Sequence, residues 1–304
     1  MNKILVVGSI GLDSVETPFG KVTDAPGGSA TYFSMAASFF TELNLVAIVG
    51  DDFPREQINY LKKRGIDTTG LTVTAGKTFR WAGKYEYDLN QAHTLDTQLN
   101  VFADFKPQLP PAYKNTPFVF LANIDPELQL DVLKQVAAPK LVACDTMNFW
   151  IDKKKDALKK IISLANILFI NEAEIRHLTG QANLVKAAKE IFSWGTGTIV
   201  VKQGEYGALM FDKKFVFSAP AFPIEQVMDP TGAGDSFAGG FMGYLAKTGE
   251  ITEKSLRQAT IFGSVIASFN VEDFSFNRFK TLKTEEIQAR FKEFKNLSHF
   301  EEIL

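Results

Sequence analysis

The chain has 304 residues, of which 45% are hydrophobic and 22% are charged, and this length suffices for one large α/β domain or for two modest ones. Its formal net charge is −2 and it contains no long basic run, so electrostatics give no reason to expect binding to nucleic acid or to an anionic membrane. The single cysteine, Cys144, excludes an internal disulfide bond, and no Cys/His cluster has the spacing of a zinc site. The apolar stretch that opens the chain is too short for a signal peptide and no later run reaches membrane-spanning length, so we expect a cytoplasmic protein.

Strands and helices alternate in the first quarter of the chain. Apolar runs predict buried strands at residues 3–7 and 45–49, and apolar-rich or periodic segments predict helices at residues 30–43 and 53–63. This alternation predicts a parallel sheet covered by helices.

Residues 72–105 break this pattern. They are rich in Thr, Phe, Tyr and Trp, and they alternate in character from Phe79 to Tyr87, which favours strands over a crossover helix. A short β-excursion from an α/β body is interpreted either as a lid or as an extra edge hairpin, and composition does not separate these two interpretations.

The strand–helix alternation resumes at residue 117. It predicts strands at residues 117–121, 140–144, 167–170 and 198–202, and helices at residues 127–137, 154–165, 172–178 and 184–193. A hairpin is predicted at residues 208–217, followed by helices at residues 233–247, 253–269 and 284–294. No internal repeat and no linker-like segment interrupts the sequence, so we predict one domain over residues 1–304 with a β-lid inserted at about residues 72–105.

The segment from Asp229 to Gly240 carries the chemistry. Its turn Gly232-Ala233-Gly234 opens an apolar helix, and backbone amides at such a helix start favour an anion that small residues allow to approach closely. Asp235 falls in the first helical turn, where a carboxylate tends to stay ionised and can accept a proton. The alternative is that Asp235 is merely a good residue for a helix start and that the glycines make a tight turn.

Two further glycines, Gly239 and Gly240, fall inside the same predicted helix. Each destabilises a helix by about 1 kcal/mol relative to Ala. Their presence indicates that another backbone or a ligand packs closely against this helix.

The run of residues 229–240 as a whole resembles the C-terminal signature of the ribokinase-like (PfkB) carbohydrate kinase family. Other segments agree with the family in order and spacing: Gly8-Ser9-Ile10-Gly11-Leu12-Asp13, Pro26-Gly27-Gly28-Ser29-Ala30, Gly50-Asp51-Asp52, Asn171-Glu172-Ala173-Glu174 and Lys202-Gln203-Gly204-Glu205-Tyr206-Gly207. The resemblance covers nearly the whole chain. It implies a three-layer α/β/α fold with a central, mostly parallel sheet and a small β-lid.

The resemblance also implies the chemistry, which is transfer of the γ-phosphoryl group of ATP to an alcohol. Asp235 would take the proton of the acceptor hydroxyl, and the amides of Gly232, Ala233 and Gly234 would form an anion hole. Glu174 would organise Mg²⁺ through water, and Asp229 would contribute to a site for a monovalent cation such as K⁺. The residues implied in nucleotide binding are Asn171, Lys202, Gly204 and Gly207, and those implied in acceptor binding are Asp13, Gly27 and Gly28.

The acceptor is a small molecule whose identity is left open. The chain has Gly11 and Tyr32 where family members that use free sugars usually carry asparagine; Gly11 makes room and Tyr32 offers a ring for stacking, so a nucleoside or a cyclitol is as consistent with the sequence as a sugar. Asp125 follows a predicted strand at a position from which relatives sometimes reach the substrate. The alternatives are a phosphosugar kinase, with Arg80 and Lys84 of the lid binding the phosphate, and a non-catalytic metabolite sensor of the same fold.

Some relatives pair their lid strands between subunits. An exposed aromatic sheet edge would be a liability for a monomer, so the sequence leaves open a homodimer through the lid.

Overall fold

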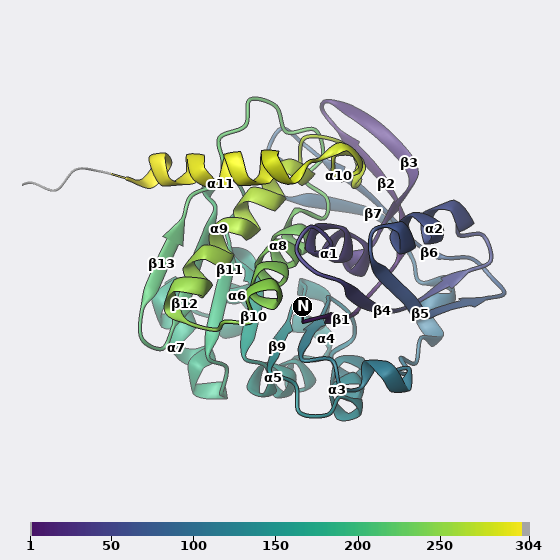
Figure 1. The fold of residues 1–304 in the computed structure, drawn as a ribbon, viewed down its shortest axis with the longest axis horizontal. Helices are drawn as coiled ribbons and strands as arrows, with labels where there is room; N and C mark the ends of the chain where they lie inside the picture. The colour runs from purple at the N-terminus through teal and green to yellow at the C-terminus, as the bar shows by residue number, and fades with distance from the viewer. Residues whose placement is uncertain (1, 300–304) are drawn as a thin grey trace, which may run out of the picture.

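A nine-stranded sheet forms the body of the molecule in the computed structural model, which describes residues 2–299 (Figure 1). From one edge to the other, its strands are β13 (Val216–Ala219), β12 (Ala208–Asp212), β11 (Thr198–Lys202), β10 (Ile167–Asn171), β9 (Leu141–Cys144), β8 (Phe118–Leu121), β1 (Ile4–Val7), β4 (Leu43–Gly50) and β5 (Ile66–Thr74). Neighbouring strands from β11 to β5 pair in parallel, whereas β12 and β13 form an antiparallel end. The mostly parallel sheet expected from the sequence is confirmed.

Helices cover both faces of this sheet. One face carries α1 (Ser29–Ala37), α2 (Arg55–Lys63), α8 (Ala233–Thr248), α9 (Glu253–Asn270), α10 (Asn277–Thr281) and α11 (Thr284–Ser298), and the other carries α3 (Pro126–Gln135), α4 (Asn148–Lys153), α5 (Lys155–Leu164), α6 (Glu172–Thr179) and α7 (Leu184–Trp194). Strand β1 shows why both faces are apolar: Ile4 and Val6 enter one core, while Leu5 and Val7 enter the other. The result is the three-layer α/β/α architecture expected from the resemblance.

A separate four-stranded sheet lies beside α1 (Figure 1). Its order is β3 (Gly20–Gly27), β2 (Gly11–Thr17), β6 (Phe79–Tyr85) and β7 (Ala92–Gln98). The expected β-excursion therefore supplies half of this lid sheet, and residues 11–27, which showed no strand pattern, supply the other half. The boundary at residue 72 was also placed too early, because β5 extends to Thr74 and pairs with β4 in the main sheet.

The first helix is shorter than the sequence indicated. It ends at Ala37 instead of residue 43, because Leu43 is taken into the sheet, where it pairs with Ile4 of β1 and Ile66 of β5. The short helices α4 and α10 and the 3₁₀ turns Asn100–Asp104, Pro111–Tyr113 and Gly204–Tyr206 were not predicted. They are too short to show a helical period.

Helix α8 is packed closely between α1 and α9. A Cβ atom added to Gly239 would lie 2.5 Å from the carbonyl oxygen of Phe33 on α1, and one added to Gly240 would lie 2.7 Å from the carbonyl oxygen of Phe262 on α9. The close approach predicted from these two glycines is confirmed. It fixes α8, whose first turn carries Asp235, between two neighbouring helices.

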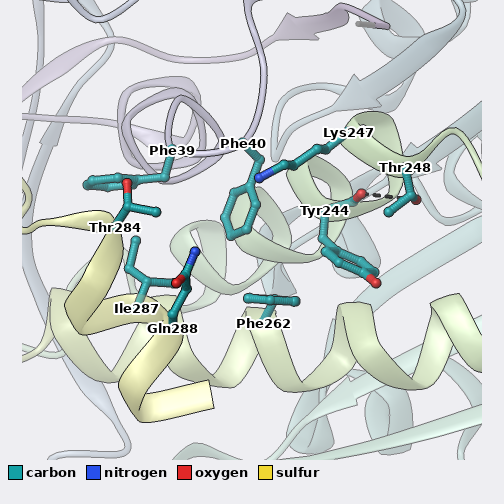
Figure 2. A pocket seen from close by; sticks show the side chains of 9 residues that line it. All are labelled: Phe39, Phe40, Tyr244, Lys247, Thr248, Phe262, Thr284, Ile287 and Gln288. Atoms are coloured by element: carbon teal, nitrogen blue, oxygen red, sulfur yellow. Dashed lines mark hydrogen bonds between the residues drawn. The ribbon is translucent and has the colours of Figure 1, made fainter. Parts of the chain in front are cut away.

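A small cavity of about 110 Å³ lies between α8, α9, α11 and the residues Phe39 and Phe40 that follow α1 (Figure 2). Its lining includes Tyr244 and Thr248 from the last turns of α8, whereas Asp235 lies in the first turn. At a rise of 1.5 Å per residue, Asp235 and Tyr244 are roughly 14 Å apart along the helix axis. The cavity is therefore separate from the site described below.

No helix within residues 2–299 combines the length and the apolar character that crossing a membrane requires.

Candidate active site

Two residues expected to bind the nucleotide, Asn171 and Lys202, and one further carboxylate lie where parallel strands end. Asp145 directly follows β9, Asn171 is the last residue of β10, and Lys202 is the last residue of β11. These three strands are neighbours in the sheet, so their carboxyl ends share one edge. In open α/β sheets this edge is where ligands bind.

Gly232 sets up the start of α8. It is the N-cap residue with φ +74°, in the left-handed region that glycine adopts without strain. A Cβ atom there would lie 2.3 Å from the ring of Tyr32. Both the backbone conformation and the neighbouring ring therefore require glycine.

The three backbone amides of the turn Gly232-Ala233-Gly234 differ in their hydrogen bonding. The Ala233 amide donates to the carbonyl oxygen of Pro230 at 3.1 Å and closes the turn. Within residues 2–299, neither the Gly232 amide nor the Gly234 amide donates to an oxygen. The anion hole expected from three amides is thus best supplied by Gly232 and Gly234, aided by the helix dipole.

Asp235 sits in the first turn of α8, partly exposed. Burial and the negative charge of Asp145 raise its pKa to about 8, against the opposing effect of Lys202. The charge of Asp13 also contributes to this shift, which places the two carboxyl groups near each other. A carboxylate with a pKa in this range is a stronger base than an ordinary aspartate.

Lys202 and Asp145 form an ion pair beside Asp235. The Lys202 ammonium donates to the carboxylate of Asp145 at 2.8 Å, and Asp145 is almost fully buried. The same ammonium would lie 3.1 Å from a Cβ atom on Gly234, so it faces the anion-hole turn. Burial lowers the pKa of Lys202, but the negative charges of Asp145 and Glu174 raise it by more. The pKa of Lys202 therefore lies above its ordinary value, and the positive charge is retained.

Asp145 was not identified from the sequence, yet the structure places it beside Lys202 and its charge acts on Asp235. The available signal was its position directly after the buried strand β9. That position is shared by many residues, so it did not single out Asp145.

Asn171 and Glu174 bind each other across the start of α6. The Asn171 side chain accepts from the Glu174 amide at 2.7 Å, and the Glu174 carboxylate accepts from the Asn171 amide at 2.9 Å. This reciprocal cap fixes both side chains at the strand edge. Burial raises the pKa of Glu174 to about 7.

Asp13 lies in the lid strand β2 and is enclosed by the two glycines expected beside it. It accepts from the Gly28 amide at 3.4 Å, and a Cβ atom on Gly27 would lie 1.9 Å from its carboxylate. Burial raises the pKa of Asp13 to about 7, although the Gly28 amide opposes the shift. Gly28 has φ +92° and could carry no Cβ without approaching the Ser9 carbonyl at 2.6 Å.

Gly11 and Tyr32, the two residues expected to shape the acceptor site, do not have the surroundings that the sequence indicated. A Cβ atom on Gly11 would lie 2.6 Å from the ring of Phe79, so the space beside this glycine is filled by the lid and is not open to a larger acceptor. Tyr32 is 2% exposed, and its ring lies under Gly232. Its hydroxyl has no hydrogen-bond partner within the part of the chain that the structure describes.

Asp125 has the contacts of a helix cap. One of its carboxylate oxygens accepts from the Glu127 amide at 2.9 Å, and the other pairs with Lys154 at 2.7 Å. Both oxygens are thus engaged in holding α3. The structure does not place Asp125 with the group around Asp235.

Asp229 precedes the anion-hole turn and is 1% exposed. It accepts from the Thr231 amide at 2.9 Å and from the Ser275 amide at 3.1 Å. Burial raises its pKa, and these amides oppose the shift.

Gly204 and Gly207 frame the 3₁₀ turn after β11, with φ +56° and +97°. The tip of the lid hairpin reaches this turn. The Asn90 side chain donates to the Glu205 carboxylate and accepts from the Glu205 amide, both at 3.1 Å.

Comparison with known proteins agrees with this geometry. A family model described as pfkB family carbohydrate kinase matches residues 1–280. The chain belongs to the pfkB family of carbohydrate kinases. A cytidine kinase from Thermococcus kodakarensis is 30% identical to this pfkB-family protein over 250 residues, which cover 80% of this chain and 88% of the relative. The chain is accordingly a sugar or nucleoside kinase.

Solved structures agree on the fold of this pfkB-family kinase. A nucleoside kinase from Methanocaldococcus jannaschii matches with a TM-score of 0.79 and 24% identity, covering 96% of this chain and 99% of the other. A structure from E. coli described as a ribokinase II in complex with ATP and Mg²⁺ matches with a TM-score of 0.78 and 18% identity, covering 96% and 100%.

Proposed function

We propose that this kinase transfers the γ-phosphoryl group of ATP to a hydroxyl group of a nucleoside, with Asp235 as base. The observation that carries the proposal is the position of Asp235. It directly follows the free amides of Gly232 and Gly234 in the first turn of α8, and the charge of the buried Asp13 contributes to raising its pKa. A phosphoryl group held by the amides and a hydroxyl held by Asp13 would meet at this carboxylate.

The protein's part in the reaction is positioning and charge balance. Asp235 accepts the proton of the acceptor hydroxyl, because burial and Asp145 raise the affinity of its carboxylate for protons. Lys202 faces the anion-hole turn and offsets negative charge that develops on the transferred group. The amides of Gly232 and Gly234 stabilise the same charge without reorganisation.

Mg²⁺ fits this site as a partner of the nucleotide. Asp145 and Glu174 offer carboxylate oxygens near Lys202, which suit a hard cation. Within the described residues, no three side chains of the His, Cys, Asp and Glu types converge as a ready-made metal site. Glu174 would therefore hold the ion through water, and the ion would neutralise phosphate charge when bound with ATP.

A monovalent cation beside Asp229 would have to share oxygens that already accept hydrogen bonds. Both carboxylate oxygens of Asp229 already accept from backbone amides, those of Thr231 and Ser275. The Thr231 carbonyl oxygen accepts from the side chain of Asn270 at 2.8 Å. Each of these oxygens already accepts from one N–H donor and keeps one further lone pair, and no step is derived through K⁺.

A nucleoside is the acceptor that best fits the relatives and the lid. The cytidine kinase and the nucleoside kinase that resemble this chain are named for nucleosides. The lid strand β6 carries the partly exposed aromatic side chains Phe79 and Trp81, which would offer flat apolar surface to a base. A cyclitol or a free sugar would leave this surface without a partner.

The two alternatives are less well supported. A phosphosugar kinase would need free positive charge in the lid, but Arg80 pairs with Asp52 and Asp24, and Lys84 pairs with Glu16 and Glu86. A metabolite sensor would have no need of a base with a raised pKa beside free amides.

The role of Asp235 is tested by the variant Asp235→Asn. It keeps the shape of the side chain but cannot accept the proton, so we expect turnover to fall by at least about 100-fold while ATP binding is retained. Coupled measurement of ADP release gives turnover, and calorimetric titration gives ATP affinity. Turnover equal to that of the parent would eliminate the mechanism.

The acceptor is tested with a panel of nucleosides, ribose, fructose, myo-inositol and fructose 6-phosphate, with and without Mg²⁺. We expect nucleosides to give the highest kcat/KM, by at least about tenfold. Selective turnover of a free sugar or of the phosphosugar would contradict the assignment.

We also propose that the chain acts as a single catalytic domain and that it forms a homodimer through the lid. The outer lid strand β7 is exposed along its length, and the large side chains Leu95 and Tyr87 of the same hairpin are 65% and 87% exposed. An open strand edge of this kind favours pairing with a second copy. Light scattering after gel filtration would show twice the chain mass, and a monomer at micromolar concentration would contradict the proposal.

A further inference from the structure

Asn270 is a fully buried polar side chain at the end of α9, directly beside the anion-hole turn. Its side-chain nitrogen donates to the carbonyl oxygen of Thr231 at 2.8 Å. Its side-chain oxygen accepts from the Ser236 hydroxyl at 3.0 Å, and Ser236 is also fully buried. One amide group therefore binds both ends of a segment of six residues.

The segment between these two contacts is the catalytic one. Thr231 comes directly before Gly232, and Ser236 directly follows Asp235. The orientation of the Asn270 amide is fixed, because a carbonyl oxygen such as that of Thr231 accepts and never donates. The Ser236 hydroxyl must then be the donor to the Asn270 oxygen.

The backbone beside Asn270 reinforces this contact. The carbonyl oxygen of Val271 accepts from the Met228 amide at 2.8 Å and from the Asp229 amide at 3.4 Å. The Ser275 amide donates to the Asp229 carboxylate. The chain after α9 thus binds the anion-hole segment at its start, while Asn270 is the side chain that also reaches its end.

Buried polar side chains of this kind are stable only when they are paired, and once paired they hold their partners in one arrangement. Misplacement of reacting groups by about 1 Å can lower a rate by about 100-fold. A contact that fixes the amides of Gly232 and Gly234 relative to Asp235 would therefore affect the rate far more than the binding of either substrate.

We propose that Asn270 is a positioning residue that holds the anion-hole amides and Asp235 in register through its two hydrogen bonds. The inference rests on the proposed role of Asp235 and the anion hole, but the contacts themselves do not depend on that role.

The decisive variant is Asn270→Leu, which keeps the approximate volume of the side chain and removes both hydrogen bonds. We expect kcat to fall about 10- to 100-fold, with KM for ATP and for the acceptor changed by less than about threefold. Asn270→Asp keeps the acceptor for Ser236 but places a carboxylate against the Thr231 carbonyl, so it should lose kcat to a similar extent. Ser236→Ala removes only the hydrogen bond to the Asn270 oxygen and should lower kcat about two- to fivefold.

Asn44→Leu is the matched control. Asn44 is also a buried asparagine, 4% exposed, and its side chain donates to Thr116 at 2.9 Å at the start of β4, at the opposite edge of the sheet from the strand ends around Asp235. It should lower thermal stability while leaving kcat within about twofold of the parent, because it touches no catalytic segment. A kcat loss in Asn44→Leu equal to that in Asn270→Leu would show a merely structural effect and would overturn the proposal.

Hydrogen exchange measured by mass spectrometry separates this proposal from the proposed function. Amide exchange in residues 228–240 should accelerate in Asn270→Leu and stay at the parent rate in Asn44→Leu, whether or not an acceptor has been found. Unchanged exchange together with a parental kcat would overturn the proposal. If Asn270→Leu does not fold, kcat and amide exchange are measured in Asn270→Asp and Ser236→Ala instead. Parental kcat and parental exchange in both of these variants would overturn the proposal.

Discussion

The basicity of Asp235 is set by burial and by the charge of Asp145, which together raise its pKa to about 8. In the proposed mechanism, Asp235 must be deprotonated to accept the proton of the acceptor hydroxyl. Activity should therefore rise with pH below about pH 8 and level off above it, with a slope approaching tenfold per pH unit on the acid side.

The contribution of Asp145 is tested by Asp145→Asn. The substitution removes a negative charge that raises the pKa of Asp235 and frees the ammonium of Lys202, which lowers it. The acid limb of the kcat/KM profile should accordingly move to lower pH, by about one unit. Asp125→Asn is the control, since Asp125 pairs with Lys154 and is not among the charges that shift Asp235. A shift to higher pH, or an equal shift in both variants, would contradict the electrostatic assignment.

Single residues were predictable from the sequence where their neighbours lie close along the chain. The turn from Gly232 to Asp235 is local, so its residues alone indicated a helix start, whereas the pair Asn171 and Glu174 was implied by the resemblance of its motif to the family. The surroundings of Gly11, Tyr32 and Asp125 were not predictable. They depend on Phe79, Gly232 and Lys154, which lie far away in sequence and are brought close only by the fold.

At the scale of whole elements, apolar runs predicted the strands buried on both faces of the main sheet. Strands β2 and β3 were not predicted, because they contain charged residues and glycines and are partly exposed. Their place in the lid is set by pairing between distant segments, β2 with β6. A pattern within one segment does not contain that information.

The packing of α8 against α1 yields an element-scale prediction. Gly239→Ala raises helix propensity by about 1 kcal/mol, but its Cβ would lie 2.5 Å from the Phe33 carbonyl oxygen. Because that neighbour is backbone, the helices must separate, and we expect a net loss of about 1–3 kcal/mol in the free energy of unfolding. Urea denaturation would measure it.

Gly180→Ala provides the comparison. Gly180 ends α6 with φ +70°, and nothing lies within 4 Å of an added Cβ. Gly180→Ala should lower the free energy of unfolding by about 1–2 kcal/mol, through backbone conformation alone. Unlike Gly239→Ala, it should leave turnover unchanged, since it moves no helix that carries the catalytic turn. Equal or increased stability of Gly239→Ala would show that α1 and α8 can move apart freely.

Across the whole molecule, the lid joins the two sides of the site. Strand β2 carries Asp13, the expected acceptor ligand, whereas the tip between β6 and β7 touches the turn Gly204–Tyr206, where the nucleotide is expected. The Thr231 hydroxyl also lies 3.3 Å from the hydroxyl of Tyr85 on β6. The lid is therefore in contact with both the anion-hole segment and the nucleotide turn.

The contact of Asn90 with Glu205 is exposed and consists of two hydrogen bonds, so each contributes no more than about 1 kcal/mol and the contact can open and close. If it holds the lid over bound nucleotide, Asn90→Ala should admit water and increase ATP hydrolysis relative to acceptor phosphorylation, by about two- to fivefold. The ratio of ADP released to phosphorylated acceptor measures this uncoupling. Gln98→Ala is the matched control, because Gln98 contacts Asp96 within the same lid strand and does not reach the nucleotide turn. Identical ratios for the two variants would mean that the lid tip has no part in excluding water, and that closure depends on Tyr85 and the strands alone.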